Sequence, residues 1–149
     1  GEELRYSDLP SFAPELLHSF REGDPLKSKH LEKALMQFAE EGAAKVFKPN
    51  IGSGFIIGVI GSLQFDVLAS RIELEYGLPV RFEPSQFNSA RWISGGKTDL
   101  DKFSSENKQH IATDHDNDLV FLTRLQWDID RVERDYPEIN LSATKEMMR

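Results

Sequence analysis

Apolar residues recur along this chain with two different periods, which predict alternating strands and helices. The clearest pattern lies in the middle, where the uncharged run Phe55–Ile60 is rich in β-branched residues and predicts a buried strand. Gly61 ends this run, Ser62 is a favourable N-cap, and Gly77 is a typical helix terminator. The helix predicted between them has one apolar face, formed by Phe65, Leu68, Ala69, Ile72 and Tyr76.

A first helix is predicted upstream, because Asp24 is a good N-cap, Pro25 suits the first helical position and Gly42 ends the pattern. Short strands flank it: an edge strand near Leu16–Phe20 and a second strand over Ala44–Lys48. A glycine turn over 52–54 joins that second strand to the central strand as a hairpin. The inner face of the first helix is formed by Leu31, Ala34, Leu35 and Phe38.

A further strand over Leu78–Phe82 completes the order strand, helix, strand, strand, helix, strand. That order predicts an α+β fold with an antiparallel sheet, the ferredoxin-like split βαβ plait. We therefore predict a plait over residues 1–84 and an α/β extension over 85–149, with no evident internal repeat. The extension is predicted to contain a strand over 87–93, a short helix with the capping pattern Thr98–Asp101, a polar loop over 104–117, a strand over 119–122, a helix ended by Pro137 and a last strand over 139–141.

Composition narrows the possible functions. The 149 residues carry a net charge of −7 at pH 7, so general affinity for nucleic acid is not expected and any RNA contact needs a local basic patch. Without cysteine the chain has no disulfide, thiol nucleophile or thiolate metal ligand. No apolar run is long enough to span a membrane. The chain starts at Gly1 without Met, and we expect it to be part of a longer protein.

Two motifs resemble ligand sites but lack essential parts. The glycines Gly52, Gly54 and Gly58 precede a strand and lack the following Lys-Ser or Lys-Thr of a phosphate-binding loop, so a turn is favoured. The stretch Asp114–Asp118 has the alternating aspartates of a calcium loop. It lacks the turn glycine, and Leu125 stands where a bidentate Glu is needed, so a solvated turn is favoured. Neither motif supports a catalytic, cofactor-binding or metal-ligating residue.

Seven short phrases, spread in order along nearly the whole chain, carry a resemblance to a known family. They are Pro10-Ser11-Phe12-Ala13-Pro14-Glu15, Asp24-Pro25-Leu26-Lys27-x-Lys29, Glu40-Glu41-Gly42-Ala43, Gly58-Val59-Ile60-Gly61-x-Leu63-Gln64-Phe65-Asp66-Val67, Arg71-x-x-x-Glu75-Tyr76, Ala90-Arg91-Trp92 and Arg134-Asp135-Tyr136-Pro137. These phrases resemble bacterial peptide-chain release factor three, the GTPase of translation termination. The central block also resembles the third domain of elongation factor G.

The resemblance implies that residues 1–149 are the C-terminal domain of a longer cytoplasmic GTPase, following its GTPase and β-barrel domains. GTP and Mg²⁺ would then bind elsewhere in the parent, and this domain would have no catalytic, cofactor or metal site. Its implied partners are the ribosome, through rRNA and ribosomal protein, and the parent's own domains. Its implied role is mechanical, as the parent promotes the departure of class I release factors.

Candidate ribosome contacts are the cations outside the apolar stripes, which form a local basic patch only if the fold gathers them. Ordinary surface cations are the equal alternative. Trp92 is predicted in the core or a domain interface, and Trp127 partly exposed. The other class of function is a free-standing plait, either a small-molecule sensor or an acylphosphatase-like enzyme. The candidate contacts are Lys27, Lys29, Lys45, Lys48 and Arg91.

Overall fold

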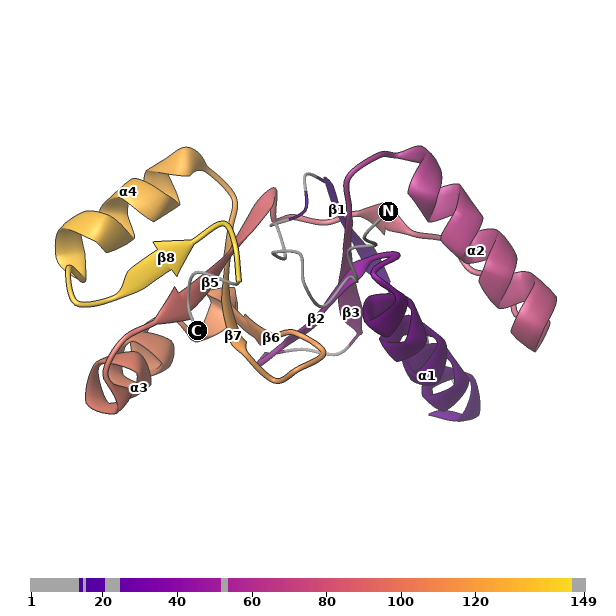
Figure 1. Cartoon of the computed structure of the whole chain (residues 1–149), viewed down its shortest axis with the longest axis horizontal. Helices are drawn as coiled ribbons and strands as arrows, with labels where there is room; N and C mark the ends of the chain where they lie inside the picture. Colours follow the sequence, from indigo (N-terminus) through magenta and orange to yellow (C-terminus); the bar gives the residue numbers. More distant parts are fainter. Residues whose placement is uncertain (1–13, 15, 21–24, 52–53, 146–149) are drawn as a thin grey trace, which may run out of the picture.

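The computed structural model describes residues 14, 16–20, 25–51 and 54–145 as an α+β domain with helices at both ends and strands between them (Figure 1). The fold class predicted from the sequence is therefore confirmed. The elements are β1 Leu16–Phe20, α1 Pro25–Glu41, β2 Lys45–Pro49, β3 Phe55–Val59, α2 Leu63–Tyr76, β4 Glu83–Pro84, β5 Ser89–Ser94, α3 Lys97–Glu106, η2 Lys108–His110, β6 Ile111–Thr113, β7 Leu119–Thr123, α4 Gln126–Asp135 and β8 Asn140–Ser142.

The strands of the described residues join one sheet in the order β4-β1-β3-β2-β6-β7-β5-β8, and all their pairings are antiparallel. The elements β1 to β4 form the predicted split βαβ plait, with α1 and α2 on one face. The prediction that Leu16–Phe20 lies at an edge is wrong, because β1 pairs with β3 on one side and β4 on the other. The fourth strand is also displaced, from the predicted 78–82 to the two residues of β4.

The second half of the chain repeats the first half's topology. The elements β5, α3, β6, β7, α4 and β8 follow the same order in sequence, and their strands lie in the order β8-β5-β7-β6. The predicted extension is thus a second plait. The predicted loop over 104–117 is wrong in part, because it contains the end of α3, the turn η2 and the strand β6.

Equivalent elements also carry equivalent residues, so the expectation of no internal repeat is wrong. The ends of α1 and α3 share the pattern Leu-x-x-Phe-x-x-Glu, followed by a buried residue in the next strand. The ends of α2 and α4 share Arg-x-Glu-x-x-Tyr, with a β-branched residue after the Arg. The matched residues are Leu35, Phe38, Glu41, Val46, Arg71, Ile72, Glu73 and Tyr76 in the first plait, and Leu100, Phe103, Glu106, Ile111, Arg131, Val132, Glu133 and Tyr136 in the second.

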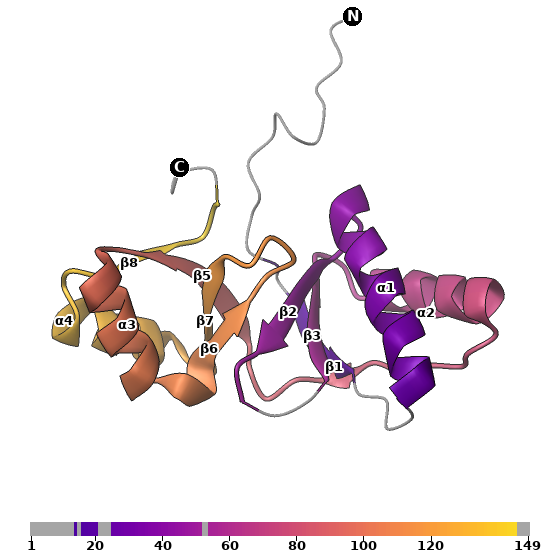
Figure 2. The same cartoon turned by 90° about the horizontal axis from the view of Figure 1, so that it is seen from below.

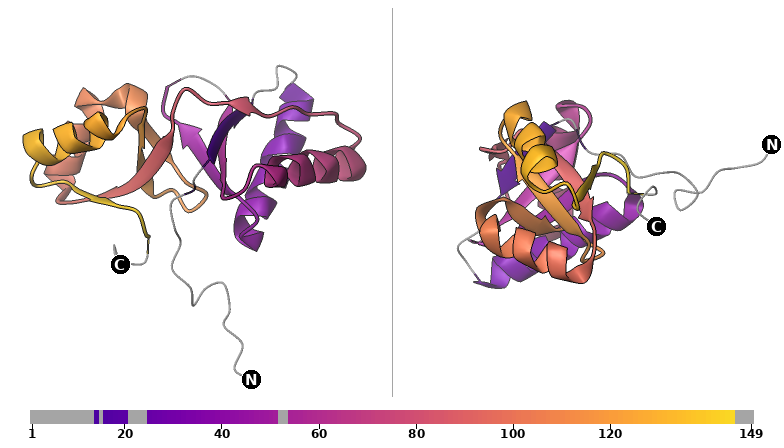
Figure 3. Two further views of the ribbon diagram at one scale, coloured as in Figure 1. Left: turned by 90° about the horizontal axis from the view of Figure 1, so that it is seen from above. Right: turned by 90° about the vertical axis from the view of Figure 1, so that its left-hand side faces the viewer.

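The two plaits join through β2 and β6, which are equivalent strands. Lys48 pairs with Thr113, and the repeat makes these two residues equivalent to each other. A pseudo-two-fold axis therefore passes between them. The helix pairs lie at opposite ends of the molecule, and the strands of both plaits lie between these ends (Figures 2 and 3).

Among the described residues, buried side chains form three clusters that make up the core. One lies under α1 and α2, and another under α3 and α4. The remaining cluster is built from the helix-free faces of both plaits, with Phe47 from the first and Trp92 from the second. Each plait thus covers the face that the other plait's helices leave open. The shared cluster comprises Leu17, Phe47, Ile56, Phe87, Ala90, Trp92, Ala112, Val120 and Leu122.

Helix boundaries agree with the sequence better than helix caps do. Helix α2 spans 63–76 as predicted and ends at Gly77, whose φ of 67° lies in the left-handed region that glycine favours. Ser62 makes no side-chain capping hydrogen bond. The predicted capping pattern Thr98–Asp101 is wrong, because α3 begins at Lys97 with Gly96 as its N-cap and Thr98 lies inside the helix. The predicted N-cap Asp24 and the turn residues 52–53 lie outside the described residues. No helix in the described part of the chain is long and apolar enough to cross a membrane.

Candidate functional site

The structure separates the candidate ribosome contacts into two groups. Lys27 and Lys29 lie in the first turns of α1 and are exposed. Both are outside the helix's buried face, as the sequence predicts. Of the other three cations, Lys45 and Lys48 lie on β2, at the junction between the plaits, and Arg91 lies on β5 of the second plait.

The strand cations point in different directions. Lys45 shares the inner face of β2 with Phe47, and its Nζ lies 5.8 Å from the centre of the Trp92 ring. Burial lowers the pKa of Lys45, and the nearby Lys145 ammonium lowers it further. Lys48 is exposed on the opposite face of β2, and Arg91 lies on the helix-covered face of the second plait. The fold therefore does not gather these three side chains into one patch.

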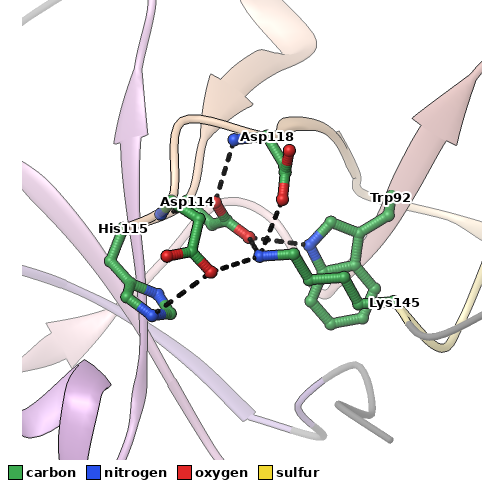
Figure 4. A network of polar contacts seen from close by, with 6 residues as sticks. Trp92, Asp114, His115, Asp118 and Lys145 are labelled. Carbon is green, nitrogen blue, oxygen red and sulfur yellow. Dashed lines mark hydrogen bonds and ion pairs between the residues drawn. The ribbon is translucent and has the colours of Figure 1, made fainter. Parts of the chain in front are cut away.

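The aspartate-rich turn between β6 and β7 binds the ammonium group of Lys145 (Figure 4). The Lys145 Nζ lies 2.8 Å from Asp114 Oδ2, 2.7 Å from Asp116 Oδ2 and 2.8 Å from Asp118 Oδ2. The indole Nε1 of Trp92 also donates to Asp114 Oδ2, at 3.1 Å. Backbone amides of Asp116 and Asp118 donate to the other oxygen, Asp114 Oδ1. Every oxygen of the Asp114 carboxylate is thus bonded.

Electrostatics hold this cluster in its charged form. Burial alone would raise the pKa of Asp114, but hydrogen bonds from Lys145, the Asp118 amide and Trp92 outweigh it and leave the pKa below its ordinary value. Burial likewise opposes the charge on Lys145, yet its bonds to the three carboxylates raise the pKa of its ammonium. The Lys145 hydrogen bond is the main cause of the lowered pKa of Asp116.

The prediction of a solvated turn is wrong for Asp114, which is 6% exposed. Ligand atoms of Asp114, His115 and Asp116 lie within 4.8 Å of one another, a spacing that suits a metal ion. The Lys145 ammonium already contacts two of these carboxylates, so the chain itself supplies a cation that offsets part of their negative charge. What the cluster does is tie the segment after β8 to the β6–β7 turn and to Trp92 of the shared core.

The fold defines the class of protein as a tandem α+β plait. Its aspartate cluster binds Lys145 of the same chain, and its candidate contacts Lys27 and Lys29 are exposed in the first turns of α1. The family comparison is more specific. The class II release factor RF3 C-terminal domain family matches residues 6–133. Since this match covers more than half of the chain, the chain belongs to that family, and it is a non-catalytic domain of a GTPase factor that acts in translation termination.

Sequence reasoning missed Lys145 and the outward face of α2. Lys145 follows β8 closely, and its partners are more than 25 residues away in sequence, so no local pattern joins them. For α2 a signal was present: Leu63, Val67 and Leu74 form a second apolar stripe at helical spacing, outside the predicted inner face.

Proposed function

We propose that this domain contacts the ribosome for a parent GTPase that promotes release and recycling of class I release factors. Membership of the RF3 C-terminal domain family supports this proposal. The shared core between the plaits also supports a mechanical role, because a domain that transmits a nucleotide-dependent rearrangement needs to move as one body. In this proposal the GTP and Mg²⁺ sites lie in the parent's GTPase domain.

The observation that carries the contact surface is the exposure of Lys27 and Lys29 at the start of α1. The N-terminus of a helix carries a partial positive charge, so two exposed ammonium groups there add to a field that attracts phosphate. On a domain of net charge −7 this is a local attraction. The secondary candidates in this proposal are Lys45 and Lys48 on β2 and Arg91 on β5.

The test is charge reversal in the full-length factor. Lys27→Glu combined with Lys29→Glu should weaken ribosome binding about tenfold or more at moderate salt, because two phosphate contacts become repulsions. The salt dependence of the binding constant should also become shallower. Both side chains are exposed, so the melting temperature should stay unchanged.

A matched control is Lys102→Glu with Lys108→Glu, which makes the same charge change on exposed lysines of the second plait. The control separates a specific surface from the effect of net charge. Equal binding by the wild-type factor and the Lys27/Lys29 variant would rule out this contact surface.

A further inference from the structure

The outward face of α2 is apolar. Leu63, Val67 and Leu74 lie at i, i+4 and i+11, on the side opposite the buried face, and they are 75%, 57% and 83% exposed. Ile60, just before the helix, is 66% exposed, and its backbone amide donates to Gln64 Oε1 at 3.2 Å. The helix lies at the outer end of the molecule (Figure 3). We define the α2 stripe as Ile60, Leu63, Val67 and Leu74.

The plait fold does not require a leucine at the end of this stripe, as a comparison with the second plait indicates. When α2 and α4 are matched through their shared Arg and Tyr, Leu74 corresponds to Arg134 and Val67 to Trp127. Helix α4 thus places a charged side chain where α2 places its most exposed leucine, whereas Trp127, like Val67, is apolar and 57% exposed. Three large apolar side chains aligned on one exposed helix face, with exposed Ile60 before the helix, are typical of a surface that binds a partner.

Carboxylates border the stripe on both sides. Asp66 and Glu73 lie along one side, and Glu75 lies along the other, all of them exposed. Arg71 is the one cation of α2, and its guanidinium binds Glu41 at 2.8 Å and Glu75 at 3.5 Å. The border therefore presents negative charge to an incoming partner.

This charge selects the chemistry of the partner. An RNA backbone would meet carboxylates, and a second copy of this domain would bring the same negative border against itself. A complementary surface carries apolar side chains at its centre with Lys and Arg around them. A basic protein has this chemistry.

We propose that the α2 stripe docks on a basic protein of the ribosome, with its leucines buried against apolar side chains and its carboxylates paired with Lys or Arg. This inference rests on the proposed function, since it assumes that the domain contacts the ribosome. It differs in partner and surface from the Lys27 and Lys29 contact, which is made to phosphate.

The first experiment replaces Leu63→Gln and Leu74→Gln in the full-length factor and measures binding to purified ribosomes. Glutamine has nearly the helix propensity of leucine, and both side chains are exposed, so folding should be unchanged. Affinity should fall about tenfold or more, because each leucine loses the free energy of burial at the interface. The matched control is Leu125→Gln, which removes a leucine that is 64% exposed at the start of α4 and should bind like wild type.

The second experiment identifies the partner by placing a photo-reactive amino acid at Val67 of the full-length factor bound to ribosomes. A crosslink to a basic ribosomal protein supports the proposal. A crosslink to rRNA, to a second copy of the factor or to the factor's own preceding domains overturns it. Wild-type affinity of the Leu63/Leu74 variant overturns it as well.

The two proposals fail separately. If Lys27→Glu with Lys29→Glu weakens binding and the leucine variant does not, the domain contacts the ribosome but α2 does not dock there. If the wild-type factor and a factor lacking residues 1–149 bind ribosomes equally, the proposed function itself is wrong, and the docking inference is overturned with it.

Discussion

The first helix of each plait ends with a phenylalanine and, three residues later, a glutamate, but the side chain that contacts both of them differs between the plaits. In the first plait, Arg71 lies 4.6 Å above the Phe38 ring and binds Glu41. In the second, Tyr136 packs edge-on against Phe103 at 4.8 Å between ring centroids. Its hydroxyl group donates to Glu106 at 2.8 Å.

The equivalent arginine of the second plait has moved to another partner, since Arg131 donates to Asn107 Oδ1 at 3.2 Å. The phenylalanine and glutamate therefore stay while the group that joins them changes from a guanidinium to a phenol. The two plaits thus link their helices at the same position of the fold. The link is made by an arginine guanidinium in the first plait and by a tyrosine ring and hydroxyl group in the second.

The largest expected effect comes from breaking one plait's own core. Phe103→Ala empties a fully buried site and should cost about 3–5 kcal/mol of unfolding free energy. Because the shared cluster joins both plaits, amide protection should fall in β3 as well as in β7. Hydrogen exchange of the variant and of the matched Phe38→Ala variant measures this. Loss of protection confined to the mutated plait would show that the plaits unfold independently.

A smaller effect is expected from Lys145→Met, which leaves Asp114 buried without its ammonium partner. The unfolding free energy should fall by about 3 kcal/mol near neutral pH. The pKa of Asp114 is lowered by folding, so its contribution is present above the ordinary value of about 3.9 and is lost as pH falls through the folded value. The pKa of Lys145 is raised by folding, so its contribution is present below about 10.4 and is lost only as pH rises through the folded value.

Urea denaturation of Lys145→Met and wild type from pH 3 to pH 8 tests this sign. The difference in unfolding free energy between wild type and Lys145→Met should be constant between about pH 5 and 8 and should shrink below pH 4. Lys97→Met is the control, because its ion pair with Asp101 is exposed and should contribute little at any pH. A gap that widens in acid would contradict the assigned charges.

The smallest effects sharpen the comparison of the two arginines. Arg71→Met and Arg131→Met should each lower the melting temperature only slightly, because both bonds are partly exposed. The Arg71 loss should diminish more with added salt, since Arg71 is paired with a carboxylate and the hydrogen-bond partner of Arg131 is an amide. Thermal melts at low and high salt distinguish them. Equal salt dependence would mean that the Glu41 charge is irrelevant.

The sequence predicts most clearly what is encoded locally. The bounds of α2 follow from one apolar face ended by Gly77, and those of α1 from Pro25 and Gly42. The burial of Trp92 and the exposure of Trp127 are also confirmed. Each of these depends on residues within a few turns of one another, where period and propensity carry the information.

What the sequence could not provide depends on distant partners. Strand β6 is only three residues long and follows polar residues, and it becomes a strand because β2 and β7 pair with it. Asp114 looks like a solvated residue until Lys145 and Trp92 are brought to it. The candidate cations fail to gather for the same reason: strand direction and pleat, which local patterns do not specify, set Lys45 and Lys48 on opposite faces.

The pairing of β2 with β6 has a consequence for biosynthesis. When the first plait leaves the ribosome, β2 is an open sheet edge, and it stays open until Ile111–Thr113 has been made. Open edges recruit strands from other chains, whereas the finished sheet ends in the two residues of β4 and the three of β8. The nascent chain is therefore most prone to aggregate after the first plait has emerged and before Ile111–Thr113 has been made. Once β6 pairs with β2, this open edge no longer exists.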